Sequence, residues 1–257
     1  MASNYHTYVL LNKPLIIDSP ETVATFDGSV SNLKVAHLDS ETIALVVTAL
    51  ATPSGDLFNS EKATNSQSTG KVYTSLFVRH WDAYVSENKN AIWYTTLKKP
   101  SKNLKTYVNS PLRNAFKGHS FAIESPVPPF GGAGDFDISK NGLVFVAKDP
   151  KINPANYTKT DLYYIPLKFT ESQAPSPQLI KTGNLKGYSS NPVFSPDAKS
   201  VVFTRMKSMQ YESDKPRLLV VPDITDLSNT QEFYETEDGE GGCKQTLVLH
   251  EIQFRLL

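Results

Sequence analysis

The chain of 257 residues carries 26 basic and 26 acidic residues, so its formal net charge is zero. This balance provides no basic surface for nucleic acid or an anionic membrane, and we expect neither partner. A single cysteine, Cys243, excludes an internal disulfide and a multi-cysteine metal site. The 13 Phe and 12 Tyr, together with 17 Pro, favour short strands and turns.

No secretory signal is expected at the amino terminus, because residues 1–8 contain no basic stretch followed by an apolar run. The longest uncharged apolar run, residues 43–51, is far shorter than the roughly 20 residues that a membrane-spanning helix needs. One glycosylation sequon begins at Asn156, and it has two readings: a glycan site in a secreted protein, or a chance match to a short pattern.

Short windows rich in Val, Ile, Phe, Tyr and Thr, ending in Gly, Pro, Asn or Asp, predict an all-β chain. The predicted strands are residues 33–38, 42–48, 71–79, 91–97, 135–138, 143–147, 161–167, 192–194, 200–204 and 217–221. Residues 51–70, rich in Ser, Thr and Asn, are predicted to form a mobile surface loop.

Two stretches repeat each other at a constant spacing. Phe136 aligns with Phe194, and Phe145 aligns with Phe203 at the same offset. A third, weaker copy begins near residue 33. Each copy reads as strand, polar turn, strand, loop and strand, and in the second copy Pro196 and Asp197 are suited to close the turn. Such units are typical of propeller blades.

We therefore expect a partial β-propeller of about four blades over residues 21–236, with a β-sandwich as the alternative. Residues 1–20 are left unassigned, and residues 237–257 fit no blade pattern and are expected to form an irregular tail.

Several ordered segments carry a resemblance to a known family. They are Val78-Arg79-His80-Trp81-Asp82-Ala83-Tyr84, Asn90-Ala91-Ile92-Trp93-Tyr94, Glu124-Ser125-Pro126-Val127-Pro128-Pro129-Phe130-Gly131-Gly132-Ala133, Pro154-Ala155-Asn156-Tyr157-Thr158, Asn191-Pro192-Val193-Phe194-Ser195-Pro196-Asp197 and Tyr211-Glu212-Ser213-Asp214. Together they resemble the fungal dipeptidyl peptidase V group of the prolyl oligopeptidase family. The resemblance is thinner over residues 20–70 and absent from residues 235–257.

The resemblance implies a secreted two-part serine exopeptidase that cleaves dipeptides from the amino terminus of peptides. One part is a propeller, usually seven-bladed, and the other is an α/β-hydrolase domain with a Ser-Asp-His triad. We expect this chain to be a propeller fragment without the catalytic domain, and so not catalytic by itself. A stand-alone propeller that binds a protein partner is the alternative function.

The residues themselves offer no catalytic centre. The nearest approach to a nucleophile elbow is Gly118-His119-Ser120-Phe121-Ala122, which ends in Ala and runs into a proline-rich segment that leaves no room for a helix. The five histidines show no zinc-binding spacing, so neither a metal nor a cofactor is expected.

Two groups of residues remain as candidates. Because related enzymes hold the substrate ammonium with propeller carboxylates, the resemblance suggests Glu212 as an amine anchor with Tyr211 beside it. A solvated acidic loop is the alternative. Arg79, His80, Trp81 and Asp82 form a polar cluster, in which we expect a buried Arg79–Asp82 pair and Trp81 as a packing anchor rather than substrate contacts.

Overall fold

The structure is a computed structural model that describes residues 6–9, 22–63, 68, 70–99, 107–119, 123–211 and 213–234. Within these residues it contains β-strands, one short 3-10 helix and no α-helix, so the predicted all-β class is confirmed. The chain divides into two compact units, Met1–Gly118 with Phe169–Gln173, and His119–Lys168 with Ala174–Leu257.

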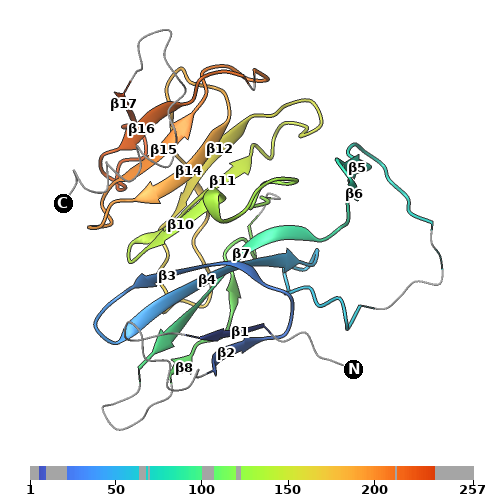
Figure 1. Ribbon diagram of the computed structural model, residues 1–257, viewed down its shortest axis with the longest axis vertical. Coiled ribbons are helices and arrows are strands. Elements are labelled where there is room, and N and C mark those ends of the chain that lie inside the picture. Colours follow the sequence, from blue (N-terminus) through green and yellow to red (C-terminus); the bar gives the residue numbers. More distant parts are fainter. Residues whose placement is uncertain are drawn as a thin grey trace. The chain divides into compact units, whose positions relative to one another are not determined.

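The first unit is built on one antiparallel sheet of five strands (Figure 1). Its strands are β3 (Ser31–His37), β4 (Thr42–Ala51), β7 (Lys89–Lys98), β8 (Val108–Asn109) and β9 (Arg113–Asn114), with both β8 and β9 paired to β7. Two further pairs are β1 (His6–Val9) with β2 (Thr22–Phe26), and β5 (Arg79–His80) with β6 (Ala83–Tyr84).

The centre of this sheet is the long pairing of β4 with β7, which runs from Thr42 opposite Lys98 to Ala51 opposite Lys89. Both strands are rich in β-branched and aromatic residues and are buried on both faces, which suits a central position. The indole N–H of Trp93 donates to the carbonyl of Ala49 at 3.2 Å, so this polar group is paired inside the core.

The second unit contains two four-stranded sheets, in each of which every strand pairs antiparallel with the next (Figure 1). The first sheet follows η1 (Ala133–Asp135) and consists of β10 (Phe136–Ser139), β11 (Gly142–Lys148), β12 (Thr160–Ile165) and β13 (Gln178–Leu179). The second consists of β14 (Ser189–Phe194), β15 (Val201–Arg205), β16 (Arg217–Val221) and β17 (Gln231–Tyr234).

These two sheets are the two copies of the sequence repeat. Val144 lies opposite Tyr164 in the first sheet, and the equivalent Val202 lies opposite Val220 in the second. The pairing differs at the hairpin, because Phe136 faces Phe145 whereas Phe194 faces Val201 rather than Phe203. The first ladder continues to Ser139 opposite Gly142 and leaves a turn of two residues, whereas the second ends at Phe194 opposite Val201 and leaves the longer turn of residues 195–200.

The longer turn closes as its sequence predicts. The Asp197 carboxylate accepts the backbone N–H of Lys199 at 3.0 Å, as in an Asx-turn, and also the hydroxyl of Ser195 at 2.6 Å. Both bonds stabilise the charged form, and the pKa of Asp197 is held below its usual range, first by the Ser195 hydroxyl.

One apolar core joins the two sheets. It contains Val144, Val146, Leu162 and Tyr164 from the first sheet, and Phe194, Val201, Phe203, Leu219 and Val221 from the second. The alternate residue Val202 lies in a separate cluster with Leu218. Each sheet is therefore apolar on both faces, a pattern that fits stacked layers of a partial propeller or a sandwich.

One expectation about the segment between β4 and β7 was wrong. Residues 71–79 are not a strand: only Arg79 belongs to one, and Val72 is 94% exposed because no neighbouring strand covers it. The described residues of the predicted surface loop of residues 51–70 include a compact turn, in which the backbone N–H of Thr52 donates to the carbonyl of Asp56 at 2.8 Å; the mobility of the loop stays a prediction. Most of residues 1–20 and all of residues 237–257 lie outside the described residues.

Candidate functional site

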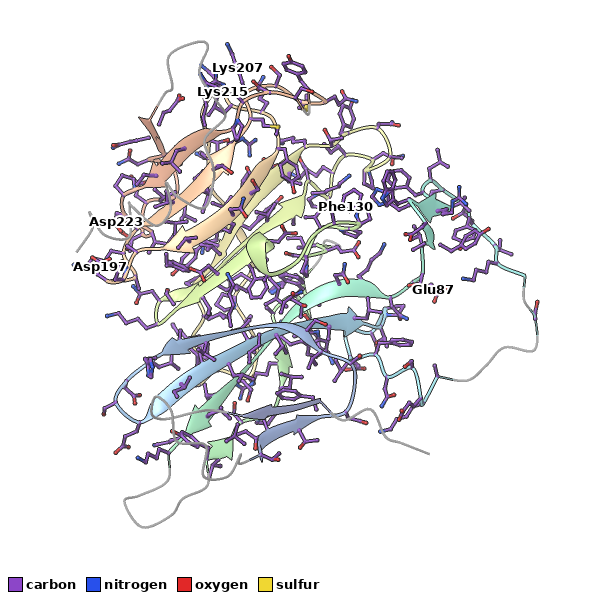
Figure 2. All side chains as sticks on the ribbon, in the orientation of Figure 1. Glu87, Phe130, Asp197, Lys207, Lys215 and Asp223 are labelled. Carbon is purple, nitrogen blue, oxygen red and sulfur yellow. The ribbon has the colours of Figure 1, made fainter. Side chains whose placement is uncertain are left out.

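The predicted site residue Tyr211 lies in the loop of residues 206–216, which joins β15 to β16. The equivalent loop of the preceding repeat, residues 149–159, joins β11 to β12. In antiparallel meanders these two connections leave the sheets at the same end, and a hydrogen bond of 2.5 Å from Gln210 Nε2 to the carbonyl of Asn156 joins them. Figure 2 shows Lys207 and Lys215 at this end of the unit, with Asp197 and Asp223 at the other.

The loop of residues 206–216 begins directly after Arg205, the last residue of β15, which is 2% exposed. Its guanidinium donates to Asp161 Oδ1 at 3.0 Å and to Ser189 Oγ at 2.6 Å. It also donates to the backbone carbonyls of Leu185 at 2.8 Å and Thr160 at 3.1 Å. Burial lowers the pKa of Arg205, while Asp161 opposes that shift, and an arginine remains charged in this setting.

The other loop is tied to the same carboxylate. Lys159, next to the start of β12, lies 2.8 Å from Asp161 Oδ2 and 3.6 Å from Asp149 Oδ2. Burial, and then the negative charges of Asp161 and Asp149, raise the pKa of Tyr163. Asp161 thus accepts from Arg205 through one oxygen and from Lys159 through the other, which satisfies both oxygens of a buried acid.

Internal hydrogen bonds join the described residues of the loop of residues 206–216. Asp214 Oδ2 accepts the backbone N–H groups of Lys207 at 2.7 Å and Ser208 at 3.3 Å. The backbone N–H of Asp214 donates to the carbonyl of Tyr211 at 3.0 Å. Tyr211 itself is 58% exposed, so this ordered loop presents an aromatic side chain with a hydroxyl to solvent.

The second predicted anchor, Glu212, lies outside the described residues, and its position stays a prediction. Asn156 is exposed on the loop of residues 149–159, and its backbone N–H donates to the carbonyl of Asn153 at 3.0 Å. An exposed turn is the setting in which a sequon is accessible to glycosylation.

The predicted polar cluster lies on the β5–β6 hairpin. Arg79 and Asp82 are both exposed, so the expected buried pair is wrong: β5 and β6 form a two-stranded sheet with no further strand paired to them. Trp81 occupies this turn with φ 57° and is 66% exposed, so it is not a packing anchor within the unit. His80 instead stacks on Phe77, with ring centroids 4.3 Å apart.

No catalytic or metal centre is found in the part of the chain that the structure describes. Ser120, from the segment nearest to a nucleophile elbow, lies outside it. The described residues contain no group of three or more His, Cys, Asp or Glu side chains placed to hold a metal ion. Among the same residues no helix has the length and apolar character needed to cross a membrane.

A cavity of about 710 Å³ in the first unit was not anticipated from the sequence. Phe26 and Trp93 contribute to its lining, and so do Asp56 and Lys117, whose side chains form an ion pair 2.5 Å long. Asn114 Nδ2 donates to the carbonyl of Gly55 at 3.0 Å across the same region. The ion pair joins residues far apart in the sequence, so no local pattern predicts it.

Sequence reasoning also missed Arg205, Asp161 and Lys159. The available signal was the position of Arg205 at the end of the apolar run Val201-Val202-Phe203-Thr204, where a charge enters a buried strand. Charged residues in such positions are usually paired.

No family model matches the chain. Among curated proteins, dipeptidyl-peptidase 5 of Aspergillus fumigatus is 38% identical over 212 residues, which cover 77% of this chain and 28% of that protein. A probable dipeptidyl-peptidase 5 of Emericella nidulans is 36% identical over 234 residues, 87% of this chain and 31% of the relative. One from Arthroderma benhamiae is 37% identical over 197 residues. The chain spans less than a third of the length of these relatives.

Proposed function

We infer from this homology to fungal dipeptidyl-peptidase 5 that the chain is the propeller portion of a secreted serine exopeptidase of that kind, represented by residues 21–236. The identity of 38% over 77% of the chain carries this inference. The two consecutive four-stranded meanders of the second unit support it, because each has the strand order of a propeller blade.

We propose that the role of this portion is to bind and admit the substrate rather than to cleave it. A dipeptidyl peptidase must hold the free ammonium of its substrate at a fixed distance from the nucleophile. A carboxylate does this through a charge-assisted hydrogen bond, and Glu212 is the candidate, with Tyr211 as its neighbour. The ordered, solvent-facing position of Tyr211 supports a binding role for this loop.

The substrate would then be a peptide with a free amino terminus. The test is titration of the full chain with trialanine and with its N-acetyl derivative, followed by NMR or calorimetry. We expect the free-amine peptide to bind more tightly, and Glu212→Gln to remove the difference. Glu87→Gln is the matched control, because Glu87 is an exposed glutamate on the other unit. Equal binding of the two peptides to the unmodified chain would overturn the proposal.

We expect the chain by itself not to hydrolyse dipeptidyl substrates, because its sequence contains no Gly-x-Ser-x-Gly motif for the nucleophile that the family resemblance implies. Release of a chromogenic leaving group by the purified chain, retained after Glu212→Gln, would contradict this expectation. In an intact relative, replacement of the matching glutamate by Gln should raise KM by more than about tenfold, equivalent to roughly 1.4 kcal/mol of binding, with a smaller effect on kcat.

A second candidate function is a protein-interaction module. It is favoured by the exposure of Val72, Trp81 and Tyr84 on the insertion between β4 and β7, since exposed apolar side chains that gather in one segment often mark a binding surface. Failure of trialanine to bind, together with capture of a defined partner that Trp81→Asn abolishes, would favour this function over the first.

A further inference from the structure

We propose that Arg205 is a positioning residue that sets the Tyr211 loop against the neighbouring loop of residues 149–159, so that the two loops form one peptide-binding edge. This inference rests on the proposed substrate-binding role of the Tyr211 loop. It concerns a residue that is itself too deeply buried to touch a substrate.

The hydrogen bonds of Arg205 reach three separate segments. Leu185 lies in the connection before β14, Ser189 begins β14, and Thr160 and Asp161 begin β12 of the other sheet. A guanidinium has five N–H donors in a fixed planar arrangement, and the four bonds occupy most of them. Arg205 therefore fixes the angle at which the second sheet meets the first at the end that carries both loops.

Stability alone is a weak reason for such a pair. Removing Arg205 and Asp161 from water carries a large desolvation cost, and apolar side chains of similar volume often stabilise a core equally well. Apolar packing, however, has no preferred direction, whereas the bonds of a guanidinium do. Geometric control of the loops is therefore the property that the ion pair supplies and an apolar pair does not.

Hydrogen bonds also restrain the part of the Tyr211 loop that is farther along the chain from Arg205. Gln210 donates to the carbonyl of Asn156 in the neighbouring loop, and Asp214 closes the turn that contains Tyr211. With its base held by Arg205 and its tip held by Gln210, the loop has lost conformational freedom before a peptide arrives. Preorganisation of this kind improves affinity because less ordering remains to be done on binding.

The main experiment compares four forms of the full chain: unmodified, Arg205→Lys, Arg205→Met, and Arg205→Met with Asp161→Leu. The double variant replaces the ion pair by apolar groups and leaves no buried charge on Asp161. We expect its Tm to fall less than that of Arg205→Met, which leaves the Asp161 carboxylate buried without the arginine, while its Kd for trialanine rises about tenfold. Arg205→Lys keeps the charge and should recover part of the affinity.

A second variant protects the test against misfolding. Gln210→Ala removes the contact with Asn156 at the surface without altering the core, and it should weaken trialanine binding about threefold. Gln178→Ala on β13 is the matched control, because Gln178 is also exposed and lies on the other sheet. The N-acetyl peptide should bind all forms with the same weak affinity.

The outcomes separate the two claims. If the unmodified chain does not prefer the free-amine peptide, the proposed function fails, and this inference fails with it. If the unmodified chain shows the preference, and both the double variant and Gln210→Ala bind trialanine as tightly as it does, the proposed function stands and the positioning role of Arg205 is wrong.

Discussion

The side-chain amide of Asn141 donates to the backbone carbonyl of Ala198 at 2.9 Å, so the hairpin turns of the two repeats contact each other. A second bond lies close by, in which the backbone N–H of Phe194 donates to the Asp137 carboxylate at 2.8 Å. Both bonds join residues 57 positions apart. The equivalent hairpins of the two copies of the repeat are therefore in direct contact with each other.

Asn141→Ala should lower the free energy of unfolding by about 1 kcal/mol, the usual contribution of such a hydrogen bond. The carbonyl of Ala198 would lose its partner on the first repeat. Urea denaturation measures the change, and Asn229→Ala at an exposed position serves as the control. Equal stability of the two variants would mean that the contact between the turns contributes nothing.

Phe203→Ala should cost about 3–5 kcal/mol, because it empties a fully buried position in the core between the two sheets. Phe203→Leu should cost less, since it retains most of the volume. Phe130→Ala is the comparison at the surface, where the side chain is 76% exposed (Figure 2), and it should change stability little. A similar loss for Phe203→Ala and Phe130→Ala would contradict the assigned core.

Asp135→Asn should alter how stability depends on pH. Burial raises the pKa of Asp135, and the hydrogen bond from the Val127 N–H offsets only part of that rise. The folded protein therefore binds this proton more readily than the unfolded chain, so stability falls as pH rises from the unfolded pKa near 3.8 through the folded one. In the variant, an amide oxygen still accepts from Val127 and this decrease disappears.

The control for that experiment is Asp197→Asn. Hydrogen bonds lower the pKa of Asp197, so its contribution to stability has the opposite sign and is lost as pH falls. Free energies of unfolding measured between pH 3 and pH 7 should show the two variants changing the slope in opposite directions. If both variants change the slope of unfolding free energy against pH in the same direction, the environment described for either Asp135 or Asp197 is wrong.

Trp81→Asn should leave the free energy of unfolding within about 1 kcal/mol of its original value. Most of the side chain is exposed, and asparagine tolerates the positive φ of this turn better than tryptophan does. A loss well beyond that range would show that Trp81 is a packing residue, as its sequence context indicated.

Asn156 should carry a glycan when the chain is expressed with a secretion signal in a fungal host. Asn156→Gln should remove the mass that an endoglycosidase removes from the unmodified chain. Thr158→Ser, which keeps the sequon, should retain that mass. If the unmodified chain is secreted without a glycan, the sequon at Asn156 is a chance match to the pattern.

Much of the second unit was predictable because its signals are local. The uninterrupted apolar run Leu143, Val144 and Phe145 indicates a strand buried on both faces, and the Pro196-Asp197 turn indicates the hairpin of the second repeat. The segment of residues 71–79 was misassigned for the converse reason. Its composition suits a strand, but pairing depends on a neighbour that the sequence does not specify.

By itself, the sequence determined the all-β class, the two-copy repeat of strands and turns, and the homology to dipeptidyl-peptidase 5. The first two follow from side-chain periodicity and turn chemistry, which act over a few residues, whereas the homology rests on 38% identity over 212 residues. Only the tertiary structure decided that Arg205 meets Asp161 and that Gln210 meets Asn156. Such contacts join residues 44 and 54 positions apart, and they form only after the strands have paired and the sheets have packed.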